Sequence, residues 1–144
     1  MTSQGKLVNI HIWDASTREL ITTIFGFQRR AVRQLDFSHD GTKLLTIGED
    51  DNHSAAVYDW ASGTKLCDAK VNPDKVYDAK WNPKNNNEFA VCGVKLMTVF
   101  TQNGSTLKGA KCQLSKLQPQ EQVISVNYVL GNILVTGTSK GNLV

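Results

Sequence analysis

The chain has 144 residues, of which 40% are hydrophobic and 20% are charged, a composition typical of a globular domain rather than a disordered one. Its net charge of +3 is small and its lysines are scattered, whereas a nucleic-acid-binding face needs a concentrated basic patch. No run approaches the roughly 18 apolar residues of a membrane-spanning helix, so we expect neither a nucleic-acid partner nor a membrane partner.

The first predicted element is a strand over residues 8–13, where aliphatic side chains alternate with Asn, His and Trp side chains. Asp14 ends this strand at a cluster of small polar residues, which favour turns because their side chains hydrogen-bond to their own backbone. A second apolar run follows at residues 20–25, so the sequence predicts a β-hairpin. Residues 26–30 are interpreted as a polar connection.

The same order of parts returns along the rest of the chain. Further short strands are predicted at residues 32–38, 43–48, 55–60, 65–71, 76–82, 89–93, 95–101, 107–114, 123–128 and 133–137. His39-Asp40-Gly41 is a strong turn signal, and residues 83–88 are interpreted as the turn at the corresponding place in the next cycle. No window shows a sustained helical pattern.

Aromatic residues recur at fixed places in these cycles. One set lies at intervals of 45 and 42 residues: Trp13, Tyr58 and Phe100. A second set lies at intervals of 44 and 47 residues: Phe37, Trp81 and Tyr128. Because they recur, we expect these side chains to pack between repeats. Asp14 and Asp59 each follow an aromatic residue, and we expect them to cap turns rather than to act as catalytic acids.

Four short strands per cycle are typical of a blade of a β-propeller, whose blades bury their apolar faces by stacking. We therefore predict an all-β fold: a partial β-propeller of about three four-stranded blades plus fragments. Closed propellers have roughly 4–8 blades, so this would be a segment of a larger propeller. The predicted boundaries are 1–31 for the end of one blade, 32–75 for the second, 76–118 for the third and 119–144 for the start of a fourth.

Short strings in the sequence resemble the WD-repeat family. They are Trp13-Asp14 after alternating aliphatic residues, and the turns Asp40-Gly41 and Ser62-Gly63. Residues 8–14, 35–38, 49–60, 76–83 and 89–93 are more closely similar to the first propeller of echinoderm microtubule-associated-protein-like proteins. This resemblance covers residues 5–110 and implies joined propellers that bind tubulin and decorate microtubules in mitotic or ciliary cytoskeletons.

The chain departs from this family pattern in three ways. It has no coiled-coil trimerisation segment and no hydrophobic motif that opens a tandem-propeller region. Gly26-Phe27 and Asn72-Pro73 stand where the family has Gly-His before a blade. The His-Asp-Ser-Trp hydrogen-bond set of many WD blades is therefore expected to be incomplete.

The sequence contains no catalytic or metal-binding pattern. Its three cysteines form no C-x-x-C pair, and they are interpreted as reduced thiols of a cytosolic protein. Its three histidines show no metal-ligand spacing, and no helix follows the glycine-rich residues 137–141. We predict a non-enzymatic protein without a cofactor or metal.

Loops are the expected place of function, because a propeller holds its connections on a rigid scaffold. Five basic residues on connections expected to share one face are the candidate partner-binding residues: Arg29, Arg30, Arg33, Lys75 and Lys140. They have two interpretations. They are either ordinary solvated loop residues or contacts to an acidic protein such as tubulin, where charge aids encounter and orientation.

Together these observations lead to one functional hypothesis and one alternative. The hypothesis is a microtubule-associated scaffold of the cytoplasmic cytoskeleton, including the ciliary axoneme, that binds tubulin and other proteins of a cytoskeletal complex. The alternative is a WD-repeat adaptor in another assembly, such as ciliary transport or a ubiquitin ligase.

Overall fold

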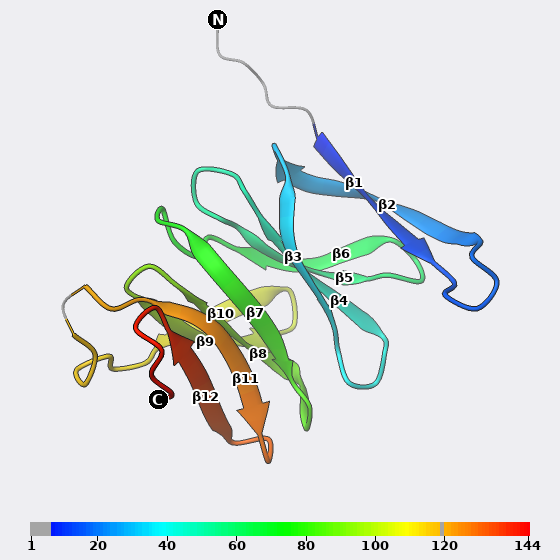
Figure 1. The fold of residues 1–144 in the computed structure, drawn as a ribbon. Coiled ribbons are helices and arrows are strands. Elements are labelled where there is room, and N and C mark those ends of the chain that lie inside the picture. Colours follow the sequence, from blue (N-terminus) through cyan, green and yellow to red (C-terminus); the bar gives the residue numbers. More distant parts are fainter. Residues whose placement is uncertain (1–6, 119) are drawn as a thin grey trace, which may run out of the picture.

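The computed structural model describes residues 7–118 and 120–144, which form twelve β-strands (Figure 1). The strands are β1 (Leu7–Trp13), β2 (Leu20–Arg29), β3 (Val32–Phe37), β4 (Lys43–Gly48), β5 (Ala55–Asp59), β6 (Thr64–Ala69), β7 (Val76–Asn82), β8 (Asn85–Gly93), β9 (Leu96–Asn103), β10 (Thr106–Lys111), β11 (Val123–Val129) and β12 (Ile133–Thr138). No helix in this part of the chain is long and apolar enough to cross a membrane. The predicted all-β fold class is confirmed.

The strands pair antiparallel with their sequence neighbours and form four sheets. Sheet 1 is β1-β2, sheet 2 is β3-β4-β5-β6, sheet 3 is β7-β8-β9-β10 and sheet 4 is β11-β12. The first strands of successive sheets, β3, β7 and β11, lie beside one another (Figure 1). The sheets do not close into a ring (Figure 1).

The main apolar core lies between sheets 2 and 3. Leu45 and Val57 of sheet 2 belong to the same buried cluster as Trp81 and Phe89 of sheet 3. The ring centroids of Trp81 and Phe89 are 5.3 Å apart in an edge-to-face arrangement, and Phe89 also stacks on Phe100 at 5.4 Å. Such aromatic pairs contribute beyond the area they bury.

The opposite faces of sheets 2 and 3 pack on the two-stranded sheets. Tyr58 of sheet 2 shares a buried cluster with Ile10 and Ile24 of sheet 1. Met97 of sheet 3 shares another with Tyr128 of sheet 4. Since successive side chains of a strand point to opposite faces, each four-stranded sheet supplies apolar residues to both of its neighbours.

Hydrogen bonds between sheets fix the spacing of their first strands. The Asp36 carboxylate accepts a bond from the Trp81 main-chain N–H (2.8 Å), and the Trp81 indole donates to the Asp36 carbonyl (3.0 Å). The Asp78 carboxylate likewise accepts from the Val126 N–H (3.1 Å). Because the two carboxylate bonds end on main-chain N–H groups, they set a strand-to-strand register without requiring a particular partner side chain.

The recurring aromatic residues fall into two groups. Four are buried: Tyr58, Trp81, Phe100 and Tyr128. Trp13 and Phe37 are exposed. No described sheet precedes sheet 1, and the two strands of sheet 1 pack on Leu44 and Tyr58 but leave Phe37 of β3 uncovered.

The two recurring aspartates lie at turns. The Asp14 carboxylate accepts hydrogen bonds from the main-chain N–H groups two and three residues later, at 2.7 and 2.9 Å. The Asp59 carboxylate does the same at 3.1 and 3.3 Å. The bonds from Thr17 and Ser16 hold the pKa of Asp14 below its ordinary value, as expected for a carboxylate that caps a turn.

Two predicted connections are wrong. The turn after β7 contains only Pro83 and Lys84, since Asn82 pairs with Asn85 and the asparagine run continues as β8. Lys43 of sheet 2 donates a hydrogen bond to the Asn86 carbonyl (2.9 Å). This contact between sheets supports the strand, and turn propensity cannot predict it because it depends only on the local sequence. Residues 26–29 are also not a connection, because the β1–β2 ladder continues to Arg29.

The cysteines provide a test of this packing. Cys67 and Cys92 are buried and Cys112 is exposed. Burial raises the pKa of Cys67 to about 11 and that of Cys92 to about 12.

At about pH 8 we expect one thiol per folded chain to react rapidly with Ellman's reagent and three after denaturation, because reaction requires an accessible thiolate. Cys112→Ser is expected to abolish the rapid phase. More than one rapid thiol in the folded chain would contradict the described packing.

Candidate functional site

Connections after the second and fourth strands of the sheets meet on one face of the molecule. Main-chain hydrogen bonds join them in pairs: Glu49 N to Ala31 O (2.8 Å), Asn72 N to Asn52 O (3.0 Å), Val94 N to Lys75 O (2.9 Å) and Ser139 N to Gln122 O (2.9 Å). We call the described residues of 29–32, 49–54, 70–75, 93–95, 112–122 and 138–141 the loop face. The candidate basic residues Arg29, Arg30, Lys75 and Lys140 lie on it, and Arg33 lies at the adjoining end of β3.

The loop between β4 and β5 is organised by Asp50. Its carboxylate accepts hydrogen bonds from the Asn52 N–H (3.1 Å), the Ser54 N–H (3.2 Å) and the Ser54 hydroxyl. His53 adopts a left-handed backbone conformation with a φ of 43°. Its buried ring places Nδ1 3.0 Å from the Asn72 carbonyl, which ties this loop to the connection before β7.

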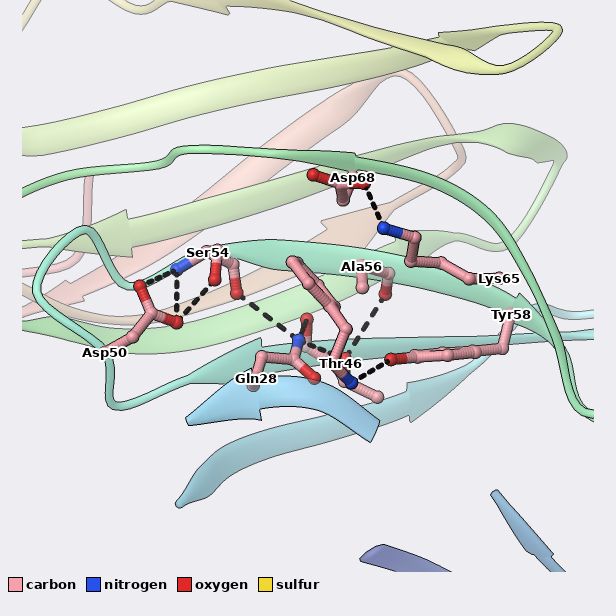
Figure 2. A network of polar contacts seen from close by, with 9 residues as sticks. Gln28, Thr46, Asp50, Ser54, Ala56, Tyr58, Lys65 and Asp68 are labelled. Carbon is pink, nitrogen blue, oxygen red and sulfur yellow. Dashed lines mark hydrogen bonds and ion pairs between the residues drawn. The ribbon is translucent and has the colours of Figure 1, made fainter. Parts of the chain in front are cut away.

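Gln28, at the end of β2, is buried beneath this loop (Figure 2). Its side-chain amide donates to the Thr46 hydroxyl (2.6 Å) and towards the Ser54 carbonyl (3.5 Å). Gly48 leaves room for this arrangement, since a Cβ there would lie 2.6 Å from Gln28 Cγ and from an Asp50 carboxylate oxygen. Gln28 therefore connects sheet 1 to β4 and to the Asp50 loop.

This network occupies the region where the WD-repeat resemblance implies a His-Asp-Ser-Trp set. Gln28, Thr46, Ser54 and Asp50 form it, and the Phe27 N–H donates beside it to the Tyr58 hydroxyl (3.2 Å) (Figure 2). Burial raises the pKa of the Tyr58 hydroxyl. Sequence reasoning missed Gln28 because a single polar residue in a polar stretch carries no periodic signal.

Acidic residues of the same loop pair with two of the candidate arginines. Arg30 forms an ion pair with Asp51 at 2.7 Å, and Arg33 forms one with Glu49 at 2.5 Å. The hydrogen bond from Arg33 is the main cause that holds the pKa of Glu49 below its ordinary value, and the charge of Lys75 contributes. The structure thus brings Arg30, Arg33 and Lys75 around one acidic loop.

The other two candidate residues lie apart from this group. Arg29 is exposed and forms no ion pair with the described residues. Lys140 lies near Glu121, whose pKa is lowered chiefly by the hydrogen bond from the Thr138 hydroxyl and slightly by the Lys140 charge. The loop face is therefore a mixed-charge surface with separate positive positions, not one basic patch.

A hollow of about 320 Å³ opens beside Gln28. It is lined by Phe27, Gln28, Arg29, Asp50, Asn52, Ser54, Asp68 and Lys70. This mixture of amides, carboxylates and cations suits a polar side chain of a partner. Within the described ranges, no group of three His, Cys, Asp or Glu residues could hold a metal ion.

Antiparallel sheets arranged side by side, with their connections gathered on one face, define an unclosed β-propeller. The structure overlays on the β-propeller domain of Cps50 (Swd1) from Myceliophteria thermophila with a TM-score of 0.76 at 17% sequence identity, covering 94% of this chain and 47% of that one. The predicted partial propeller is confirmed.

The sequence specifies the family. Residues 2–144 match the family model described as echinoderm microtubule-associated protein first beta-propeller, and the chain belongs to this family. The resemblance noted in the sequence is therefore confirmed.

Curated proteins that are similar to this chain are named echinoderm microtubule-associated proteins or echinoderm microtubule-associated protein-like proteins. The chain is 30% identical over 138 residues to human echinoderm microtubule-associated protein-like 1, covering 94% of this chain and 17% of the relative. It is 29% identical to human echinoderm microtubule-associated protein-like 2 (99% and 23% covered) and 27% identical to the 77 kDa echinoderm microtubule-associated protein of Lytechinus variegatus (98% and 22% covered). The chain thus spans about a fifth of the length of these relatives.

The Gln28 network gives a prediction about stability. Gln28→Met keeps the length of the side chain but removes the donor to Thr46 and Ser54, so we expect a loss of roughly 1–3 kcal/mol in the free energy of unfolding. Urea denaturation measures this change. Gln120→Met at an exposed position is the matched control, for which a change within about 0.5 kcal/mol is expected. Equal effects of the two variants would contradict the role of Gln28.

The ion pair of Arg33 gives a prediction about pH. Because the folded-state pKa of Glu49 is lowered, the pair stabilises the fold above the unfolded-state pKa of Glu49, and this contribution is lost as the pH falls through the folded value. In Arg33→Ala we expect the Glu49 pKa to move up towards its ordinary value. An NMR titration of the side-chain carboxyl carbon reads it directly, with Arg18→Ala as the control. An unchanged Glu49 titration in Arg33→Ala would refute the assigned cause.

Proposed function

We propose that this chain is the propeller part of a non-enzymatic, microtubule-associated scaffold that binds tubulin through its loop face. The observation that carries the proposal is membership of the microtubule-associated family over residues 2–144. The curated relatives support it, because their names describe microtubule-associated proteins. The corresponding location is the cytoplasmic cytoskeleton, including the ciliary axoneme.

The charges of the loop face support a particular mode of contact. Asp51 and Glu49 already pair with Arg30 and Arg33, whereas Arg29 forms no ion pair in the described part of the chain. Lys75 lies close enough to Glu49 to lower its pKa but makes no salt bridge there. We assign Arg29 and Lys75 the leading role in attracting an acidic protein surface, since rim charges act mainly on encounter and orientation.

We further propose that the blades divide as the sequence predicts, at residues 1–31, 32–75, 76–118 and 119–144. In that division the loop-face connections at residues 29–32, 70–75 and 112–122 join neighbouring blades, and the other loop-face connections lie within blades. A partner that contacts both Arg29 and Lys75 would bridge two of them, so the relative placement of the blades would fix the spacing of the two charges.

Co-sedimentation with polymerised microtubules tests the proposal. We expect the chain to pellet with microtubules at low salt and less so as salt increases, because exposed charges are screened. The double variant Arg29→Glu with Lys75→Glu is expected to bind roughly tenfold more weakly. The matched control changes Arg18, in the turn between β1 and β2, and Lys108 of β10 to Glu, since both residues are exposed and lie outside the loop face.

Two outcomes would overturn the proposal. A folded wild-type chain that stays in the supernatant at low salt would exclude direct microtubule binding by this propeller. An equal loss in the control variant would exclude the loop face as the contact surface. A pull-down dominated by a partner other than tubulin would favour the alternative of a WD-repeat adaptor.

A further inference from the structure

The hollow beside Gln28 lies where three parts of the loop face meet. Arg29 is the last residue of β2, Asn52 belongs to the loop between β4 and β5, and Lys70 directly follows β6. The volume of about 320 Å³ is at the lower end of the range of ligand pockets, which is roughly 300–1,000 Å³. The hollow therefore suits a single side chain better than a larger molecule.

Buried residues support the hollow from inside. Gln28 is 1% exposed, and its side-chain amide donates to the Thr46 hydroxyl and towards the Ser54 carbonyl (Figure 2). Because Gln28 belongs to sheet 1 and Thr46 to sheet 2, these contacts hold the two sides of the hollow together. A partner side chain thus meets a preformed site, which lowers the entropic cost of binding.

The two carboxylates that line the hollow already have partners within the chain. Asp50 accepts hydrogen bonds from the Asn52 N–H (3.1 Å), the Ser54 N–H (3.2 Å) and the Ser54 hydroxyl. Asp68 forms an ion pair with the Lys65 ammonium at 2.5 Å (Figure 2). The negative charge of the hollow is therefore largely compensated from inside.

The two cations that line the hollow are not compensated in this way. Neither Arg29 nor Lys70 forms an ion pair with another described residue, and both side chains are exposed. Asn52 uses its main-chain N–H and carbonyl in the loop bonds, so its side-chain amide is a further donor. What the hollow offers to a partner is thus two positive charges and an amide N–H group.

We propose that the hollow binds one acidic side chain of the partner protein. The carboxylate accepts charge-assisted hydrogen bonds from Arg29 and Lys70 and a further bond from the Asn52 amide. The half-buried Phe27 lines the same hollow and provides an apolar wall for the methylene groups of a glutamate. This inference rests on the proposed function for the identity of the partner, tubulin, but not for the chemistry of the hollow.

The balance of charges favours a carboxylate over a phosphate. A phosphorylated side chain carries a charge of about −1.5 to −2 at pH 7. Asp50 and Asp68 in the wall repel the additional negative charge, because like charges at short distance disfavour each other. A carboxylate carries a single charge, which the two exposed cations outweigh.

Fluorescence anisotropy with the full chain and a dye-labelled oligoglutamate peptide tests the proposal. Lys70→Gln is expected to weaken binding roughly tenfold, because it removes a charge-assisted contact. Lys116→Gln is the matched control, since this exposed lysine lies on another connection of the loop face and does not line the hollow. In NMR spectra the side-chain amide signals of Asn52 are expected to shift when the peptide is added to the wild-type chain. An oligoglutamine peptide of the same length should not bind.

The outcomes distinguish a site in the hollow from general attraction to the loop face. A loss confined to Lys70→Gln, with unchanged circular dichroism, supports the site. Equal losses in the two lysine variants overturn it, and so do absent binding of oligoglutamate or tighter binding of a phosphoserine peptide of the same length.

Microtubule co-sedimentation separates this inference from the proposed function. Peptide binding that depends on Lys70, in a chain that does not pellet with microtubules, contradicts the proposed function alone. Pelleting that Lys70→Gln leaves unchanged, in a chain that does not bind oligoglutamate, contradicts the site in the hollow alone.

Discussion

A β-sheet of this protein has two apolar faces and cannot bury both by itself. Sheet 2 shows the constraint most clearly, since Leu45 and Val57 face sheet 3 while Leu44 and Tyr58 face sheet 1. The recurrence of aromatic residues follows from it, because each interface between sheets needs the same large side chains at the same register. Stability therefore depends on the interfaces between sheets more than on any sheet alone.

The loop face is a consequence of the same arrangement. When sheets stack in a fixed order, their connections come together at one end and become held by hydrogen bonds such as that from Glu49 to the Ala31 carbonyl. The Asp50 turn and the buried Gln28 amide then fix the loop between β4 and β5 from inside. A rigid support beneath exposed charged side chains is the general condition for a specific binding surface.

The strand order and the sheet architecture could be predicted from the sequence, because alternation and a repeat in the forties are local and periodic signals. The Gln28 network could not, since its partners lie 18 and 26 residues away and recur in no other cycle. The difference in burial between Trp13, which is exposed, and Tyr58, which is buried, illustrates a second limit of prediction from the sequence. Both occupy equivalent places in the repeat, but only Tyr58 has a sheet against it, and the presence of a neighbour is not a property of the local sequence. The ion pairs of Arg30 and Arg33 were missed for the same reason, because loop contacts have no period.

The bonds that hold the loop face together join main-chain atoms of Ala31 and Glu49, of Lys75 and Val94, and of Gln122 and Ser139. Any amino acid except proline at the donor position can make such a bond. The exposed side chains at these positions are thus free to diverge during evolution without loss of the framework beneath them, unlike Asp50 and His53, whose side chains hold the loop between β4 and β5. A lineage can change the exposed surface of the propeller through substitutions at these positions while its fold stays constant.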